Sequence, residues 1–271
     1  MSRLWGKSLM WTDRLLISLA PNAVAFVRLR RGKVLLKKHV PTEKPVETLS
    51  STITTFGKER LRATLVLSNR FVRYAVVPFD PAVSGPEEAL ALARFHFSRI
   101  HGERAKHWDL RVSDGPAGAA RLASAVDAGQ LAAIRGCFPP GSGTKLVSVQ
   151  PYLMAAYNRW RDAIAREEAW LVLPEADGAC LAYATRAGWL SARSFKFEKF
   201  CNTLLTENLQ REQLRVAATP RAALVAPQAV LVHGAPPPAP PGWTLSRLLL
   251  PPLEGYFPQD DGAYAMALCA R

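Results

Sequence analysis

Two stretches of the chain share one pattern, in which three short β-type runs are joined by two tight turns. The first comprises residues 15–19, 23–29 and 34–38, joined by Pro21-Asn22 and Arg31-Gly32-Lys33. The second comprises residues 170–173, 180–185 and 189–195, joined by Asp177-Gly178 and Arg186-Ala187-Gly188. Apolar runs of this length with turn residues between them are typical of antiparallel meanders. We therefore expect an α/β protein with two halves, each opened by a meander.

The segment between the meanders is expected to alternate helices and strands. The expected helices cover residues 46–61, 84–100, 127–137 and 151–166, with Asp127 as the N-cap of the third. The expected strands cover residues 63–67, 71–77, 108–112, 119–126 and 144–149. Ser68-Asn69-Arg70 separates the first two strands and is a hairpin signal. The strand at 144–149 has the composition of a buried strand.

After the second meander, the sequence predicts a shorter run of elements. A helix is expected over 197–211, short strands around 215–217 and over 229–232, and a final helix over 263–270. Residues 234–242 form a Pro-rich loop that is too short and stiff to link two large domains freely.

Composition indicates a folded globular protein. The chain has 271 residues, of which 49% are hydrophobic and 21% charged, enough to bury one large core or two moderate ones. No apolar run reaches the ~18 residues that a membrane-spanning helix needs, so a cytoplasmic location is expected. The leader, residues 1–11, mixes aromatic and basic residues, and either packs on the domain or rests on a membrane surface. The four cysteines form no C-x-x-C motif and are interpreted as core residues.

The chain is strongly basic, with 35 Lys and Arg against 22 Asp and Glu and a formal net charge of +13. This balance suits an anionic partner, either nucleic acid or the inner surface of a membrane. The positive residues are scattered, which favours an ordinary solvated surface. Arg28 and Arg30 share one face of a strand, where they form either such a surface or a track for phosphates.

The order of elements resembles the duplicated actin-like (ASKHA, ribonuclease H-like) fold, and in particular the PilM/GspL/MshI group of pilus and secretion assembly proteins. Residues 1–19 are similar to the group's leader and first strand, and residues 63–80 to the start of its small subdomain. Val149-Gln150-Pro151, with the helix that follows, resembles the group's connecting helix, and residues 264–269 its closing helix. The resemblance implies a first half over 1–150, with a small α+β subdomain inserted at about 63–126, and a shortened second half over 151–271.

The sequence departs from the pattern at the positions where ATP-binding members of this fold bind the metal ion and the phosphates. Their first meander has an Asp-x-Gly turn, and the matching positions here are Ser18, Leu19 and Ala20, followed by Pro21 and Asn22. The Asp would hold the metal, the Gly would let backbone N–H groups approach phosphate, and Pro has no N–H to donate.

Two further segments of the nucleotide site are also altered. The second turn, residues 174–178, keeps Asp177 and Gly178 without the family's spacing, and the adenosine loop is reduced to His233-Gly234. The resemblance therefore implies a degenerate nucleotide cleft, for which we expect no cofactor and disfavour Mg-ATP.

Other motifs have plainer explanations. Residues 141–145 (GSGTK) lack the spacing of a phosphate-binding loop and precede a strand where that loop requires a helix. His96, His101, His107 and Asp109 do not align on one helix face as metal ligands would. Phe195, Phe197 and Phe200 are interpreted as core residues, with a base-stacking platform as the alternative.

The function that the resemblance implies is a non-catalytic adaptor for a type IV pilus or type II secretion-like machine. It would lie in the cytoplasm at the inner-membrane face and bind the cytoplasmic tail of a PilN-like single-span partner, in a groove near the region from Ala63 to Val126. The first alternative is an actin-fold ATPase or small-molecule kinase, for which Asp177 is the credible metal-binding carboxylate. The second is a basic nucleic-acid-binding protein.

Overall fold

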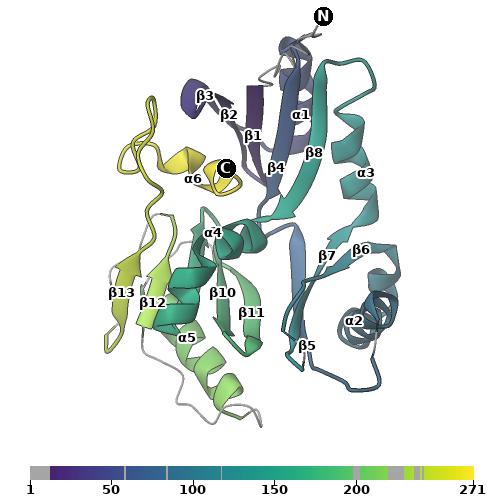
Figure 1. Cartoon of the computed structure of the whole chain (residues 1–271), viewed down its shortest axis with the longest axis vertical. Coiled ribbons are helices and arrows are strands. Elements are labelled where there is room, and N and C mark those ends of the chain that lie inside the picture. Colours follow the sequence, from purple (N-terminus) through teal and green to yellow (C-terminus); the bar gives the residue numbers. More distant parts are fainter. Residues whose placement is uncertain are drawn as a thin grey trace, which may run out of the picture.

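The structure, a computed structural model, describes residues 13–57, 59–83, 85–116, 118–197, 202–218, 229–234, 239 and 241–271. These residues build two five-stranded sheets and one three-stranded sheet. In Figure 1 the first sheet occupies the upper part of the molecule, the second sheet lies at the lower left and the small sheet at the lower right.

The first sheet begins with the predicted meander. Its strands are β1 (Asp13–Ala20), β2 (Ala23–Arg30), β3 (Lys33–Pro41), β4 (Leu61–Leu67) and β8 (Thr144–Pro151). They lie in the order β3-β2-β1-β4-β8. The first three strands are antiparallel, whereas β4 pairs parallel to β1, and β8 pairs parallel to β4.

The second sheet repeats this plan. Its strands are β9 (Trp170–Glu175), β10 (Gly178–Thr185), β11 (Gly188–Lys196), β12 (Ala229–Val232) and β13 (Thr244–Arg247). Their order is β11-β10-β9-β12-β13, with β12 and β13 parallel to β9. Because both sheets place a meander beside two parallel strands in the same order, the predicted duplication of two α/β halves is confirmed.

Helices cover both faces of each large sheet. On the first sheet, α1 (Pro45–Thr55) and α3 (Ala128–Gly136) bury one face, and α6 (Ala265–Leu268) packs on the other. The second sheet lies between α4 (Tyr152–Glu167) and α5 (Asn202–Ala217). Consecutive residues of β1 serve opposite faces, with Leu15 in the core under α1 and Leu16 in the core under α6. Asp127 caps α3 as predicted, because its carboxylate accepts a hydrogen bond from the Gln130 N–H at 2.9 Å.

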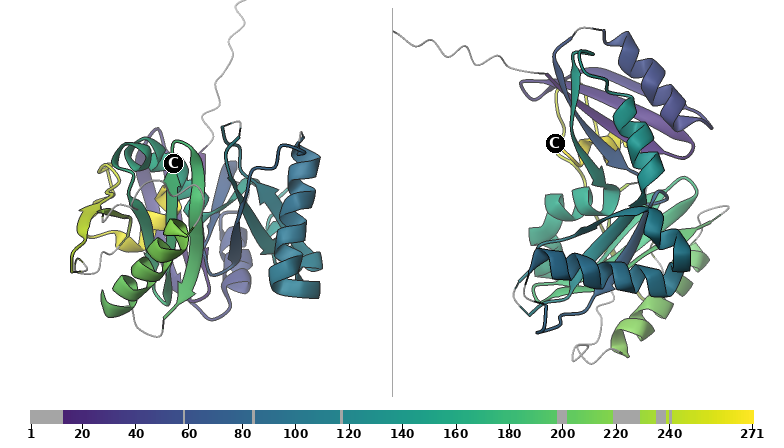
Figure 2. Two further views of the ribbon diagram at one scale, coloured as in Figure 1. Left: turned by 90° about the horizontal axis from the view of Figure 1, so that it is seen from below. Right: turned by 90° about the vertical axis from the view of Figure 1, so that its right-hand side faces the viewer.

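The small sheet is inserted between β4 and α3. It contains β5 (Val72–Val77), β6 (Trp108–Val112) and β7 (Arg121–Asp127) in the antiparallel order β5-β7-β6. One face is covered by α2 (Pro86–His101), which continues into the 3-10 helix η1 (Gly102–His107). Figure 2 shows α2 on the outside of this sheet.

The predicted hairpin between residues 63–67 and 71–77 is wrong. β4 pairs with β1 and β8 in the first sheet, whereas β5 pairs with β7 in the small sheet. Residues 68–71 therefore carry the chain from one sheet to another. β4 is buried on both faces except at Arg62, as expected for a central parallel strand, and its continuous Thr64–Leu67 run was the signal for this role.

Four other predicted elements differ from the structure. The strand at 144–149 is an edge strand, and most of its residues are only partly buried. Residues 215–217 belong to the last turn of α5 and form no strand. The first helix ends at Thr55, well before residue 61, and the final helix is a 3-10 turn, η2 (Gly262–Tyr264), followed by the short α6. The leader, Phe200 and most of the Pro-rich loop lie outside the described residues.

Candidate functional site

The turn between β1 and β2 carries no acidic side chain. Ser18 lies in β1 opposite Ala25 and is buried, and Ala20 pairs with Ala23 across the turn. Pro21 and Asn22 form the turn itself, and the Asn22 carbonyl accepts a hydrogen bond from the Thr42 N–H at 3.0 Å. These positions therefore offer neither a carboxylate to a metal ion nor the flexible glycine of a phosphate-binding turn.

The end of β4 hydrogen-bonds to the second half of the molecule. The carboxylate of Glu175, the last residue before the turn between β9 and β10, accepts hydrogen bonds from the Ser68 hydroxyl and from the Asn69 N–H, the latter at 3.0 Å. Arg70 Nε lies 3.2 Å from the Asp177 carboxylate in the same turn. We call Ser68, Asn69, Arg70, Glu175 and Asp177 the inter-half clamp, because they join the two sheets directly.

Asn69 extends the clamp to two more elements. Its side-chain oxygen accepts hydrogen bonds from the Tyr74 hydroxyl at 2.7 Å and from the Leu153 N–H at 3.0 Å. Tyr74 belongs to the small sheet and Leu153 to the first turn of α4, so one fully buried side chain connects the insert, the connecting helix and the clamp. Burial raises the pKa of Glu175, while the hydrogen bonds from Ser68 and Asn69 act in the opposite direction.

Gly178 is required by packing between β10 and β11. A Cβ atom at this position would lie 2.2 Å from the carbonyl oxygen of Phe195, a backbone atom that cannot rotate away. The neighbouring Asp177 carbonyl accepts a hydrogen bond from the Phe197 N–H at 2.9 Å. The structure thus gives this glycine a structural role that requires no phosphate.

His233 is buried and Gly234 is partly buried, and both lie near the clamp. His233 Nδ1 is 2.9 Å from the Leu248 carbonyl, and Nε2 is 3.4 Å from the Ala265 carbonyl and 3.0 Å from Cys269 Sγ. Burial lowers the pKa of His233 and raises that of Cys269, which keeps the imidazole neutral and the thiol protonated. Gly234 has φ +118°, and a Cβ there would meet the Pro174 carbonyl at 3.4 Å.

The structure thus brings together the three segments that the resemblance singled out. The Ser68 N–H donates to the Leu19 carbonyl at 2.9 Å, so the first meander meets the end of β4, which the clamp joins to residues 175–177. Gly234 lies beside Pro174, near the end of β9. Sequence reasoning missed Ser68, Asn69, Arg70 and Glu175, because it assigned the first three to a hairpin.

The remaining candidate ligands are placed apart or already paired. Arg28 and Arg30 both donate to the buried Asp13 carboxylate, at 2.6–2.9 Å, and so form an ion cluster instead of an open phosphate track.

The candidate histidine and aromatic ligands pack against other rings. The His101 ring stacks on Phe97 and meets Trp108 edge to face, beside the small sheet. Among the residues that the structure describes, no group of three His, Cys, Asp or Glu side chains could hold a metal ion. Phe195 and Phe197 stack on each other, and Phe197 is buried.

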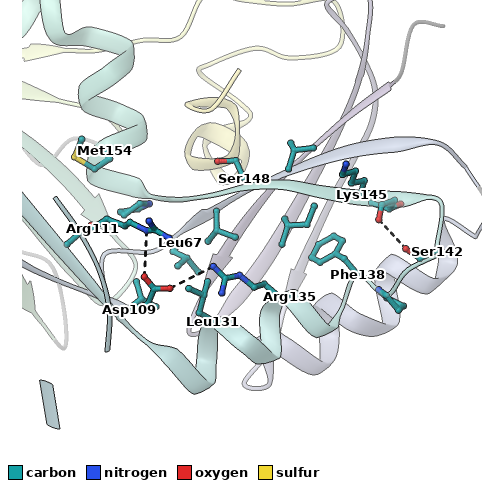
Figure 3. A pocket seen from close by; sticks show the side chains of 18 of the residues that line it. Leu67, Asp109, Arg111, Leu131, Arg135, Phe138, Ser142, Lys145, Ser148 and Met154 are labelled. Carbon is teal, nitrogen blue, oxygen red and sulfur yellow. Dashed lines mark hydrogen bonds and ion pairs between the residues drawn. The ribbon is translucent and has the colours of Figure 1, made fainter. Parts of the chain in front are cut away.

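A groove of about 870 Å³ lies between the first sheet and the small sheet. One wall is formed by β8, α3 and the loop 138–143, and the other by β6 and β7 (Figure 3). Its apolar lining includes Leu67, Leu122, Leu131, Phe138 and Met154. We call it the β8–β6 groove.

Both strands that name the groove are the last strand of their sheet. Charged side chains stand at one end, where Asp109 lies 3.7 Å from Arg111 and 3.9 Å from Arg135 (Figure 3). An edge strand can accept an extended peptide as an additional strand, and apolar pockets then select its side chains. The sequence pointed to the region from Ala63 to Val126, which supplies only one wall; α3 and β8 supply the other.

In the described part of the chain, no helix is both long and apolar enough to cross a membrane.

No sequence family and no curated protein matches the chain. Solved structures do match. The PilM–PilN type IV pilus biogenesis complex superimposes with a TM-score of 0.62 at 14% identity, covering 96% of this chain and 98% of the other.

Two further structures support the same fold. The cytoplasmic domain of EpsL, an inner-membrane component of the type II secretion system of Vibrio cholerae, has a TM-score of 0.58 at 11% identity, covering 88% of this chain and 91% of the other. A Bacteroides thetaiotaomicron protein of unknown function, described as having an actin-like ATPase fold, has a TM-score of 0.55 at 11% identity, covering 83% of each chain. Together with the duplicated sheet order, these matches show that the chain has the actin-like ATPase fold.

Proposed function

We propose that this protein is a non-catalytic adaptor in the assembly of a type IV pilus or type II secretion-like machine. It binds the cytoplasmic tail of a PilN-like single-span protein and works at the inner-membrane face. The observation that carries the proposal is the inter-half clamp, in which the turn that would face a nucleotide is bonded to the end of β4. The resemblance to the PilM–PilN complex and to the EpsL cytoplasmic domain supports the choice of machine.

The clamp leaves little chemistry for an ATPase. Asp177, the carboxylate that would hold a metal ion, is paired with Arg70, and Glu175 accepts two hydrogen bonds from the first half. The first meander offers Ser18 and Pro21 where the fold's catalytic members use an acid and a glycine-containing turn. These features favour a protein that uses the surface of this fold to bind a partner and that holds no cofactor.

The β8–β6 groove suits the tail of a membrane protein. Its volume is sufficient for several residues of an extended peptide, its lining is largely apolar, and edge strands border both walls. Val149 of β8 lines the groove on the sheet face that α3 covers, and the Arg135 side chain lines it from α3 (Figure 3). We therefore place the partner's tail between α3 and β8 on one side and β6 on the other.

Co-purification from cells tests this placement. The protein is expressed with a PilN-like single-span inner-membrane protein from the same organism, and Val149→Trp is compared with Ser51→Trp on the exposed side of α1. We expect the tryptophan in the groove to reduce co-purification at least ~10-fold by occupying the partner's space, and the one on α1 to leave it unchanged.

A charge-reversal pair provides an independent check of the same groove. Arg135→Glu should weaken co-purification, whereas Arg166→Glu, an exposed position on α4, should not. Melting curves show whether each variant is folded. Full co-purification by both groove variants, with melting temperatures near that of the unaltered protein, would contradict the placement.

A further inference from the structure

A second hollow, of about 590 Å³, lies between the small sheet and the second half of the molecule. Strand β5 and helix α2 form one side, and β11 and α5 form the other. In Figure 1 α2 and α5 lie in the lower part of the molecule, at the end away from β8 and α3, which form a wall of the β8–β6 groove. We call this second site the basic hollow, for the reason given next.

Most of the charged side chains that line the basic hollow are positive. Five basic residues, Arg70, Arg73, Arg193, Lys196 and Arg215, line the hollow, and Glu212 is the only acidic residue among the described residues that do so. The two histidines on the α2 side add no charge near neutral pH, because burial lowers the pKa of both His96 and His101. The hollow therefore has a surplus of positive charge.

Glu212 organises part of this charge. It is 2% exposed, and its Oε2 accepts a hydrogen bond from the Ser191 hydroxyl at 2.8 Å. Its Oε1 lies 3.3 Å from Arg193 and 3.4 Å from Arg215, so one buried carboxylate is shared by two guanidinium groups. Both arginine side chains are still more than half exposed, at 54% and 55%, and have N–H groups left to donate.

Arg73 and Lys196 add charge that no carboxylate balances. Both are exposed, and neither takes part in an ion pair with any described residue. Arg70 is held by Asp177 in the clamp. Arginine forks bind carboxylates in pairs of parallel hydrogen bonds, and such charge-assisted bonds are about twice as strong as neutral ones.

The concave shape and the positive charge of the hollow favour a flexible acidic peptide as the ligand. β5 and β11 lie side by side where the small sheet meets the second sheet, so the ligand contacts the side chains that line the hollow and not a free strand edge. A bilayer surface is flat and a nucleic-acid duplex is a thick cylinder, so neither can enter a concave space of this volume. The chain itself has no acidic run longer than two residues, so the ligand comes from another molecule.

We propose that the basic hollow is a second docking site, which binds an Asp- and Glu-rich segment of a protein partner. This site is separate from the β8–β6 groove and does not depend on the function proposed for that groove. Arg193 and Arg215, fixed by Glu212, bind carboxylates from the α5 side, and Arg73 binds from the β5 side. Lys196 holds the end of the segment at the end of β11.

Binding of a fluorescently labelled decaglutamate peptide, measured by anisotropy, tests the proposal. The double variant Arg73→Gln, Lys196→Gln removes two charges from the hollow without leaving Glu212 unpaired. The control, Lys38→Gln, Arg166→Gln, removes two exposed charges elsewhere, so both variants have the same net charge. We expect the hollow variant to bind at least ~10-fold more weakly than the unaltered protein, and the control to change binding less than ~2-fold.

Three results would overturn the proposal. The first is absence of decaglutamate binding at low salt, and the second is an equal loss of binding in both variants, which would indicate a general effect of net charge. The third is that the hollow variant binds decaglutamate normally but loses binding to vesicles containing anionic lipid or to single-stranded DNA, tested with the same proteins. That outcome would assign the hollow to a different class of ligand.

Discussion

Glu175→Ala should lower the free energy of unfolding by about 2–4 kcal/mol, because it leaves two buried donors without an acceptor. Ser68 is fully buried and Asn69 is 1% exposed, and both donate to the Glu175 carboxylate. Water cannot readily replace the lost acceptor at such positions. Urea unfolding followed by circular dichroism measures the change.

Two further variants make this result specific. Glu175→Gln keeps an oxygen acceptor and should cost less than Glu175→Ala, since a neutral amide can satisfy one of the two donors. Glu167→Ala removes an exposed carboxylate at the end of α4 and should change stability by no more than about 0.5 kcal/mol. If Glu175→Ala were as mild as Glu167→Ala, the two halves would not depend on the clamp.

Gly178→Ala should be similarly damaging, with an expected loss of about 3 kcal/mol. The added Cβ would lie 2.2 Å from the Phe195 carbonyl oxygen, so β10 and β11 would have to separate where β11 approaches its end. Because the obstructing atom belongs to the backbone, no side-chain rotation relieves the contact.

Gly262→Ala is the matched control, since nothing lies within 4 Å of a Cβ at that position. It should leave the urea midpoint nearly unchanged. A small effect of Gly178→Ala would mean that packing does not explain this glycine, and that its place in the second turn would have to be explained by a ligand.

The sequence was most informative where local pattern and tertiary role coincide. The meanders over β1–β3 and β9–β11 follow from runs of apolar residues separated by Pro, Asn and Gly, which determine both strand and turn. Asp127 and Pro86 mark helix starts through local hydrogen bonding and fixed backbone geometry, and both helices begin where expected. The duplicated fold could therefore be predicted from element order alone.

The candidate sites could not be predicted in the same way, because they depend on pairings between distant segments. A turn of three polar residues between two apolar runs fits a hairpin as well as a passage between sheets, and only the parallel pairing of β4 with β1 and β8 decides between them. Glu175 and Ser68 are 107 residues apart in the chain, and no local signal indicates their contact. The same holds for the walls of the β8–β6 groove and of the basic hollow.

The melting temperature with and without saturating Mg-ATP tests most directly whether the clamp has replaced a nucleotide site. A ligand at ~100 times its dissociation constant adds about 2.7 kcal/mol, which should raise the melting temperature of a chain of this length by roughly 5–10 °C. We predict no shift, because Asp177 and Glu175 are bound to the first half and the first turn offers no acid. A shift of 5 °C or more would contradict this account and show that the fold still binds nucleotide.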